Sequence, residues 1–242
     1  MSAYGATNDI TYYEYAHTIL KNLEKRKKDN LYQRSENIEI LPIGDQVHVA
    51  MLNLLFYELT GDLQYLDRAD QTGKAIVEKY GSQNNNCFKS YIGNTALEAE
   101  CIPRENYELA LLFYKLSLYR DIYQQHFKTV SQWSMQSQVI RTMNDEAASM
   151  MLATLSEATT VKVEVFGNYH NGKGRSIIAP VLSWPSLNYK IVFADQNETS
   201  QDNPFGEQCA VLICGTSFCS RPFTTFEQAF QYWHQRLTFV KN

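Results

Sequence analysis

The first two thirds of the chain carry apolar residues at the spacing of amphipathic helices. Such residues recur every three or four positions, and they predict helices over residues 12–23, 47–59, 63–77, 107–118, 135–143 and 146–155, with another that begins at 121. Asp9, Asp45 and Asp62 stand where a side-chain oxygen would cap the start of three of these helices. Gly61 stands where the second of them would end. We therefore expect helices that follow one another through short turns.

One helical segment occurs twice. Residues 54–59 have the sequence Leu-Leu-Phe-Tyr-Glu-Leu, and residues 111–116 repeat it at an offset of 57 with one change, Glu58 to Lys115. Each copy is soon followed by an aspartate and another helical pattern. A recurring helical pair is typical of stacked helical hairpins, and it predicts that Leu55 and Leu112 occupy equivalent core positions. The alternative is a chance recurrence of two common residue types.

The last third of the chain has the pattern of a small α/β unit. Alternating and β-branched residues predict strands over 161–166, 190–194 and 210–213, and helical spacing predicts helices over 176–182 and 225–237. This order of elements favours a small, partly parallel, three-stranded sheet. We therefore expect a helical-hairpin domain over residues 1–158 and a small α/β domain over residues 159–242.

Composition and charge exclude some classes of protein. Hydrophobic residues make up 44% and charged residues 20% of the 242, which is typical of a globular chain. A net charge of −4 argues against nucleic-acid binding through a basic surface. No apolar run approaches the ~18 residues of a membrane span, so we expect no membrane association. Residues 1–7 lack the pattern of a signal peptide, which predicts a cytoplasmic protein, or a secreted one if a signal peptide has been removed.

Three stretches are similar to a known family. Residues 58–66 (ELTGDLQYL) resemble a recurring hairpin motif of the spermatogenesis-associated thioredoxin-domain family, which has bacterial members. Residues 102–106 (IPREN) are similar to its Pro-Ser-Gly-Asn-Ser segment, and residues 211–222 are similar to its closing Cys-x-Asn-x-x-Cys-x-x-Pro strand and turn. Full-length members carry a thioredoxin-like domain, then an α/α toroid like that of six-hairpin glycosidases and sugar epimerases, then a short α/β tail.

The resemblance refines the expected fold class. It implies a mainly α chain with an α/β tail, in which a partial α/α toroid of stacked helical hairpins precedes a small three-stranded α/β unit. The chain departs from the family at Arg104 and Glu105, which replace a small Ser-Gly pair, and at Thr216, which replaces the Asn of the cysteine motif. The thioredoxin-like domain and the early hairpins are absent from the sequence, so an activity seated in a complete ring would be lost or altered.

A toroid of this kind builds its site on one rim, and the resemblance implies which residues would lie there. These are Asp45, His48, Glu98, Glu100, Arg104, Glu105 and Asn106. Asp45 and His48 are three positions apart and share a helix face, so together with Glu105 they are candidates for acid–base chemistry on a sugar. Arg104 and Asn106 are candidate ligand contacts. In the alternative, Asp45 is only a helix cap and His48 a surface residue.

Aromatic residues and cysteines supply further candidates. Tyr57 and Tyr114, together with Tyr12 and Tyr13, would form a sugar-stacking wall, although aromatic residues at helical spacing usually belong to a core. Cys214 and Cys219 are five positions apart around a predicted turn, and could form a reversible disulfide or remain buried, inert thiols.

Neither a disulfide framework nor a metal site is expected from the cysteines. Five cysteines, an odd number, do not suggest a framework of disulfides. A zinc site would need two ligands besides Cys214 and Cys219. Cys209 with His170 or His234 offers no recognised spacing, so we expect no metal.

A glycine-rich loop suggests nucleotide binding only on first inspection. Residues 167–173 fit the pattern G-x-x-x-x-G-K after a predicted strand. A phosphate-binding loop follows its Lys with Ser or Thr, whereas Gly174 follows Lys173 here, so we expect a simple turn and no cofactor. Residues 197–199 (Asn-Glu-Thr) form a glycosylation acceptor that matters only in a secreted protein.

Three functions remain as hypotheses. The first is a non-catalytic or degenerate binding module, because the chain holds about half the helices of a six-hairpin ring. The second is a carbohydrate-active enzyme, and the third is a redox-linked protein that uses Cys214 and Cys219. Possible partners are a carbohydrate, a separate thioredoxin-like protein and a second copy of the chain. The second copy would bind through the first helix, where Tyr12, Tyr13, Tyr15, Ile19 and Leu20 spread apolar surface over more than one face.

Overall fold

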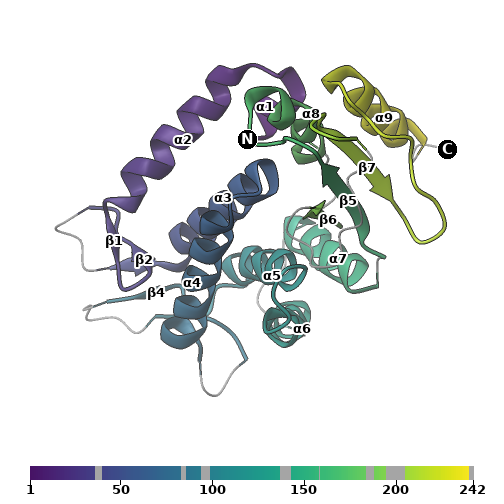
Figure 1. Ribbon diagram of the computed structural model, residues 1–242. Helices are drawn as coiled ribbons and strands as arrows, with labels where there is room; N and C mark the ends of the chain where they lie inside the picture. The colour runs from purple at the N-terminus through teal and green to yellow at the C-terminus, as the bar shows by residue number, and fades with distance from the viewer. Residues whose placement is uncertain are drawn as a thin grey trace. The chain divides into compact units, whose positions relative to one another are not determined.

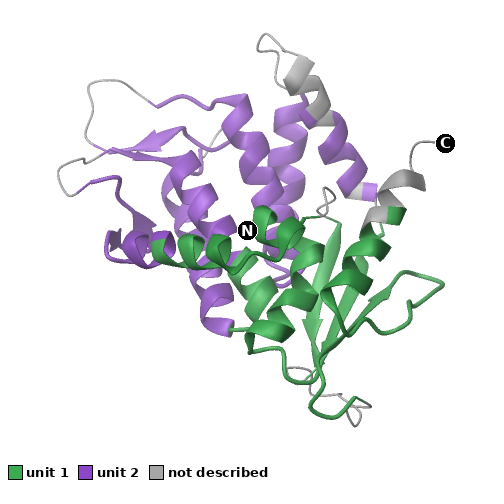
Figure 2. Cartoon of the chain, turned by 90° about the horizontal axis from the view of Figure 1, so that it is seen from above, with its two compact units in different colours: residues 1–18, 55–62, 159–242 green, residues 19–54, 63–158 purple. Residues whose placement is uncertain are grey.

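The computed structural model describes residues 1–35, 40–82, 86–93, 99–136, 143–157, 159–183, 188–194 and 205–239. Glu98, the glycosylation acceptor at 197–199 and most of the predicted helix over 135–143 lie outside these ranges. The chain forms two compact units (Figure 2). Unit 1 holds Met1–Thr18, Leu55–Asp62 and Thr159–Asn242, and unit 2 holds Ile19–Leu54 and Leu63–Ala158.

Unit 2 is built from helices with short strands between them. After the helix α2 (Ile10–Glu24), which begins in unit 1, come the strand pair β1 (Lys27–Lys28) and β2 (Leu31–Tyr32), then β3 (Leu41–Pro42), which pairs with β4 (Tyr91–Ile92). The long helices are α3 (Ile43–Thr60), whose end belongs to unit 1, α4 (Leu63–Tyr80), α5 (Pro103–Ser117), α6 (Tyr123–Gln136) and α7 (Met143–Glu157). Helices α5 and α6 form an extensively packed hairpin, and α7 packs on both (Figure 1).

A buried tyrosine ties α6 to α4. The hydroxyl of Tyr123 donates to Asp70, whose backbone oxygen lies 2.8 Å and whose Oδ1 lies 2.9 Å away. Gly73 makes this approach possible, because a Cβ at that position would lie 2.6 Å from the Tyr123 hydroxyl oxygen. Asp70 also pairs with Lys74 one turn later. These contacts fix the α5–α6 hairpin against α4 within unit 2.

The repeated segment occupies α3 and α5, but its two copies are not buried alike. Phe56 and Phe113 are both fully buried, as are Leu59 and Leu116. Leu112 is also fully buried, whereas Leu55 is only half-buried. The prediction that Leu55 and Leu112 are equivalent core positions is therefore wrong for Leu55.

Unit 1 contains the predicted three-stranded sheet, with strand order β6–β5–β7. Strand β5 (Val161–Phe166) pairs in parallel with β6 (Tyr189–Phe193) and antiparallel with β7 (Ala210–Cys214). Helix α8 (Gly172–Leu182) connects the parallel strands, and it packs against α9 (Phe226–Phe239). Val163, Ile191 and Ile213 are fully buried, so the apolar face of the sheet forms the core of this unit.

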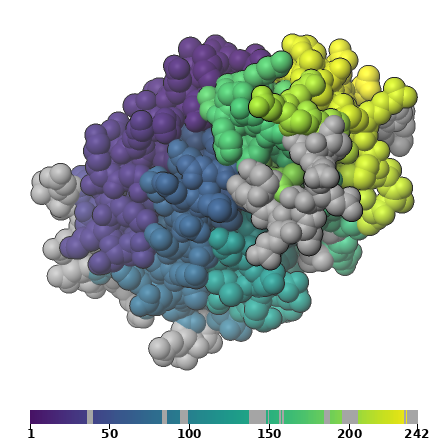
Figure 3. Space-filling model, in the orientation of Figure 1, coloured from purple at the N-terminus to yellow at the C-terminus, as the bar shows by residue number. Residues whose placement is uncertain are grey.

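The N-terminal helix α1 (Ser2–Thr7) packs on α8 in the same unit. The two helices touch at Gly5, where a Cβ would lie 2.4 Å from the backbone oxygen of Ala179. The compact units therefore differ from the expected division into residues 1–158 and 159–242, because the chain start packs with the α/β residues. Helix α2 is the next element along the chain, and it belongs to the purple part of the molecular surface in Figure 3.

The expected fold class, mainly α with an α/β tail, is confirmed. Helical hairpins of the kind expected for a partial α/α toroid are present in unit 2, and the small three-stranded α/β unit is present in unit 1. Asp9 acts near its predicted cap position, because its Oδ1 accepts from the Thr11 backbone N–H at 3.0 Å. Asp45 does not cap a helix, because α3 begins at Ile43 and places Asp45 within its first turn.

Candidate functional site

An open pocket of about 310 Å³ lies in unit 2 beside the first turns of α3. Its polar wall holds Arg34, Asp45 and His48, and Leu23, Tyr32 and Val49 also line it. The guanidinium of Arg34 donates to both carboxylate oxygens of Asp45, with Nε 2.5 Å from Oδ2 and Nη2 2.9 Å from Oδ1. The exposed fractions of the side chains are 61% for Arg34 and 28% for Asp45, so the paired groups still face solvent.

The side chain of Gln46 positions the segment that carries Arg34 next to Asp45. Its side chain is fully buried and exchanges two hydrogen bonds with the backbone of Tyr32, at 2.7 and 2.9 Å. Arg26 also donates to the backbone oxygen of Arg34 at 2.7 Å. A buried side-chain amide whose oxygen and NH2 group are both hydrogen-bonded fixes the backbone that it contacts. The chain from β2 to Arg34 is therefore anchored to α3 next to Asp45.

The first turns of α5 add charged groups to this region of unit 2. Glu108 lies between His48 and Arg104, with Oε2 3.7 Å from His48 Nε2 and Oε1 3.5 Å from Arg104 Nε. Burial raises the pKa of Glu105, and the negative charges of Glu108 and Asp45 raise it further. The Oε2 atom of Glu105 is buried and has no hydrogen-bond partner among the described residues. Glu105 thus favours its protonated form more than an ordinary glutamate does.

The structure brings only part of the predicted rim together. Asp45, His48, Arg104 and Glu105 do lie in one region of charged groups. Glu100 is exposed, and its backbone oxygen accepts from Ser90 N. Arg34 was not among the predicted site residues, because no periodic pattern marks it. Glu108 was not among them either, although its spacing of four positions from Arg104 along the predicted helix could have indicated it.

Asn106 has a structural role in place of the predicted ligand contact. The residue is fully buried, and its side chain binds both the backbone N–H and the backbone oxygen of Phe88, at 2.9 and 3.0 Å. The side chain also donates to the backbone oxygen of Ile102. All of these bonds would have to break before Asn106 could bind a ligand.

The predicted sugar-stacking wall is also not formed by the two repeat tyrosines. Tyr57 is 5% exposed and its ring contacts Phe193, whereas Tyr114 is 6% exposed and its ring contacts Phe127. Both are core residues, as aromatic residues at helical spacing usually are. Tyr13 packs against Phe56 in unit 1, and of these four tyrosines only Tyr12 is largely exposed.

Two disulfides occur among the described residues, so the expectation of no disulfide framework is wrong. Cys87 binds Cys101 in unit 2, and Cys214 binds Cys219 in unit 1. The odd count arises from Cys209, which is free and buried, and burial raises its pKa to about 11. The interpretation of Cys214 as an inert buried thiol is also wrong, because the turn after β7 returns Cys219 to it.

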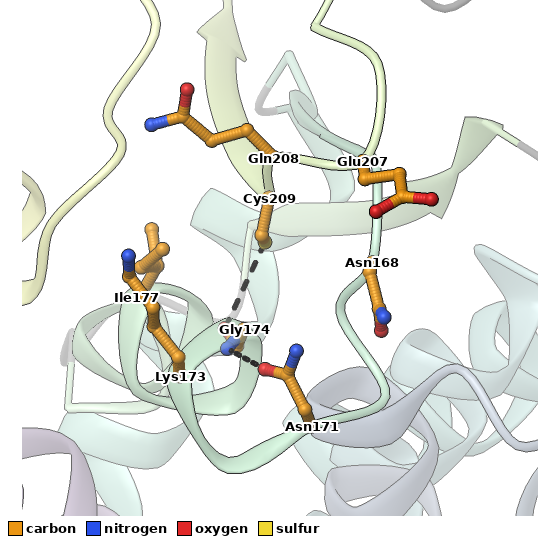
Figure 4. A pocket seen from close by; sticks show the side chains of 8 residues that line it. All are labelled: Asn168, Asn171, Lys173, Gly174, Ile177, Glu207, Gln208 and Cys209. Atoms are coloured by element: carbon orange, nitrogen blue, oxygen red, sulfur yellow. Dashed lines mark hydrogen bonds between the residues drawn. The ribbon is translucent and has the colours of Figure 1, made fainter.

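A second pocket, of about 270 Å³, lies in unit 1 at the start of α8 (Figure 4). It is lined by residues of the glycine-rich loop, among them Asn168, Asn171 and Lys173. Asn171 caps the helix, because its Oδ1 accepts from Gly174 N at 2.8 Å.

Close packing explains two glycines of this region. A Cβ on Gly174 would lie 2.4 Å from Tyr169 Cα, and one on Gly167 would lie 2.0 Å from the backbone oxygen of Gln208. These glycines are therefore required for packing, without any need for a phosphate ligand.

Neither a cluster of metal ligands nor a membrane-spanning helix is found among the described residues. Within the ranges that the structure describes, no three His, Cys, Asp or Glu side chains gather into a group that would hold a metal ion. None of the described helices has the length and apolar character needed to cross a bilayer.

Comparison with known proteins finds a distant structural likeness. No protein family matches the sequence, and no curated protein is significantly similar to it. A crystal structure of a family 76 glycoside hydrolase from a bovine Bacteroides thetaiotaomicron strain is similar, with a TM-score of 0.47 and 14% sequence identity. The match covers 55% of this chain and 32% of the hydrolase chain. This likeness is too distant to bear on activity or ligand.

Proposed function

We propose that the chain is a non-catalytic binding module whose ligand site is the pocket of Arg34, Asp45 and His48. The observation that carries this proposal is the two-bond contact between Arg34 and Asp45 on the wall of an open pocket. Such a pair presents N–H donors beside carboxylate acceptors, and neighbouring sugar hydroxyls both donate and accept. We therefore propose a small polyhydroxylated ligand, such as a monosaccharide or a disaccharide.

The same contact argues against catalysis by Asp45. A general acid must release a proton and a general base must accept one, whereas both carboxylate oxygens of Asp45 already accept hydrogen bonds from the guanidinium of Arg34. Sugar hydrolysis usually needs a second carboxyl group across the bound ligand. Glu105 does not line the pocket, and its Oε2 is buried.

Titration calorimetry with a panel of monosaccharides and disaccharides tests the proposal. We expect saturable binding that weakens at least about tenfold, or ~1.4 kcal/mol, in Arg34→Ala and in Asp45→Asn. Arg120→Ala is the matched control, because Arg120 forms a similar surface pair with Asp67 at 3.2 Å in unit 2. No binding across the panel, or equal losses in all three variants, would contradict the proposal.

One observation favours a second candidate, an enzyme that performs acid–base chemistry on a carbohydrate. The raised pKa of Glu105, near Glu108, Asp45 and His48, is what a proton-donating carboxyl group requires. Turnover of any sugar in the panel, abolished in Glu105→Gln while binding persists, would establish the enzyme. Binding that is unchanged in Glu105→Gln, without turnover in the parent protein, supports the binding module.

The sequence resemblance supports a further proposal about partners. Residues 58–66 and 211–222 resemble the spermatogenesis-associated thioredoxin-domain family, so we propose that a separate thioredoxin-like protein binds this chain. Cross-linking in cells of the source organism followed by mass spectrometry is the test. Recovery of this chain without any thioredoxin-like protein would contradict the proposal.

The disulfides support a proposal about the compartment. Disulfides persist in oxidising compartments and are rare in the cytoplasm, so Cys87–Cys101 and Cys214–Cys219 favour an oxidising location over the cytoplasmic one predicted from the sequence. Thiol trapping at the moment of cell lysis tests this. If Cys87 and Cys101 are both labelled as free thiols, the protein resides in a reducing compartment.

A further inference from the structure

The two disulfides differ in how far solvent reaches them. Cys219 is exposed and Cys214 half-buried in unit 1, whereas in unit 2 Cys87 is only 1% exposed and Cys101 is half-buried. Thiol–disulfide exchange requires a thiolate to reach one sulfur of the bond, so access controls its rate. Because Cys219 is the most exposed of these four cysteines, a reductant reaches Cys214–Cys219 in the folded protein more readily than Cys87–Cys101.

The turn that this disulfide closes is also held by backbone hydrogen bonds. Gly215 N donates to Phe218 O at 2.9 Å inside the turn, and Ser220 N donates to Ile213 O at 2.8 Å just beyond it. Further along, Val211 and Phe223 exchange two bonds of 2.9 Å each. Opening the disulfide therefore leaves the returning segment paired with β7, which keeps Cys219 close to Cys214 for reoxidation.

A lysine is the cross-strand partner of one of the two cysteines. Lys162 on β5 is the register partner of Cys214 on β7, and directly opposite residues place their Cβ atoms about 4.5–5.5 Å apart on one face of the sheet. Lys162 is exposed and also pairs with Glu164. A nearby cation stabilises a thiolate, so Cys214 is the better leaving sulfur, and the more exposed Cys219 is the sulfur that is attacked.

We propose that Cys214–Cys219 is a reversible redox site that exchanges with a dithiol. The dithiol's thiolate attacks Cys219 Sγ, forms a mixed disulfide and displaces Cys214 as a thiolate beside Lys162. The second thiol of the dithiol then attacks the dithiol's first sulfur, which is bonded to Cys219 in the mixed disulfide. This attack releases Cys219 as a thiolate, and the Cys214 and Cys219 thiolates both take up protons. Two electrons pass to the protein, and the dithiol becomes a disulfide.

Timed alkylation of the folded protein tests the site. The protein is treated with dithiothreitol, quenched, labelled with a maleimide and mapped by mass spectrometry, while circular dichroism follows the fold. Because access governs exchange, we expect Cys214 and Cys219 to be labelled at least about tenfold faster than Cys87 and Cys101. The circular dichroism spectrum should not change, and oxidised dithiothreitol should restore the bond. Equal labelling rates at the two disulfides, or unfolding on opening of Cys214–Cys219, would overturn the proposal.

A trapping experiment and two lysine variants test the direction of attack and the role of Lys162. When reduced glutathione opens the disulfide and a maleimide traps the released thiol, mass spectrometry should find glutathione on Cys219 and the maleimide on Cys214. Lys162→Gln should slow opening of the disulfide at least about threefold. Lys173→Gln, which changes an exposed lysine on α8, should not change the rate of opening. Glutathione on Cys214 and the maleimide on Cys219 would overturn attack at Cys219, and equal rates in the two lysine variants would overturn the role of Lys162.

Discussion

At the scale of the residue, Glu105 is a carboxyl group whose charge is unfavourable in the folded protein. Burial and the neighbouring Glu108 and Asp45 raise its pKa above the usual value. The folded state therefore holds the proton more tightly than the unfolded state does. By linkage, the stabilisation from this proton is complete below the ordinary glutamate pKa and is lost as the pH rises through the raised pKa.

Glu105→Gln should therefore stabilise the protein at neutral pH. The amide cannot ionise, so we expect Tm at pH 7 to rise by about 2–4 °C at most. The advantage should vanish below pH ~4, where the native carboxyl group is protonated in both states. Thermal unfolding between pH 4 and pH 8 measures this. Glu108→Gln is the control and should give no gain, because Glu108 lies close to Arg104 and His48; the same gain in both variants would contradict the prediction.

Gly174 and Gly172 make a matched pair at the start of α8. A Cβ on Gly174 would lie 2.4 Å from Tyr169 Cα, whereas the nearest atom to a Cβ on Gly172 is 3.9 Å away. Gly174→Ala should therefore cost about 1–3 kcal/mol through overpacking, and Gly172→Ala should cost nothing. Urea unfolding followed by circular dichroism distinguishes the two. Equal stabilities would mean that packing does not require a glycine at 174.

At the scale of the element, periodic patterns predicted the long helices and the sheet but not the short strands. The β-branched alternation of 161–166 predicted β5, and helical spacing predicted α5 and α9. Strands β1 to β4 are two residues each, which is too short for a period to be visible. The Arg34–Asp45 contact was missed for a similar reason, because it depends on the buried Gln46 and not on any pattern near Arg34.

The repeated segment in α3 and α5 allows a direct comparison of burial. Leu112→Ala should cost about 2–5 kcal/mol, because it empties a fully buried position. Leu55→Ala should cost less than about 2 kcal/mol, because solvent already reaches the half-buried Leu55 side chain. Chemical unfolding of both variants gives the two values. Equal losses would show that the two positions are equivalent after all.

At the scale of the whole molecule, the unexpected feature is where the chain start packs. Sequence periodicity assigned residues 1–158 to one helical domain, whereas Met1–Thr18 belongs to the unit that contains the sheet. Helix α1 has six residues, which is too few for a period that would reveal its buried face. Its contact with α8 depends on Gly5, whose missing side chain admits the Ala179 oxygen. A single glycine in a short helix does not indicate such a contact from the sequence.

Exposed apolar residues on α2 predict that the protein forms a homodimer. Tyr12, Tyr15 and Ile19 follow one another at helical spacing and are 45%, 71% and 38% exposed, which forms an apolar stripe at the surface. Since cyclic dimers are the commonest homo-oligomers, we expect two copies to bind through this stripe. Light scattering coupled to size exclusion at micromolar concentration should give the mass of a dimer.

Tyr15→Glu should give a monomer, because a dimer would bury the charge of the introduced glutamate. Ile122→Glu, at a 55% exposed position in unit 2, should remain a dimer. A single-chain mass for the unmodified protein, unchanged in either variant, would contradict the dimer.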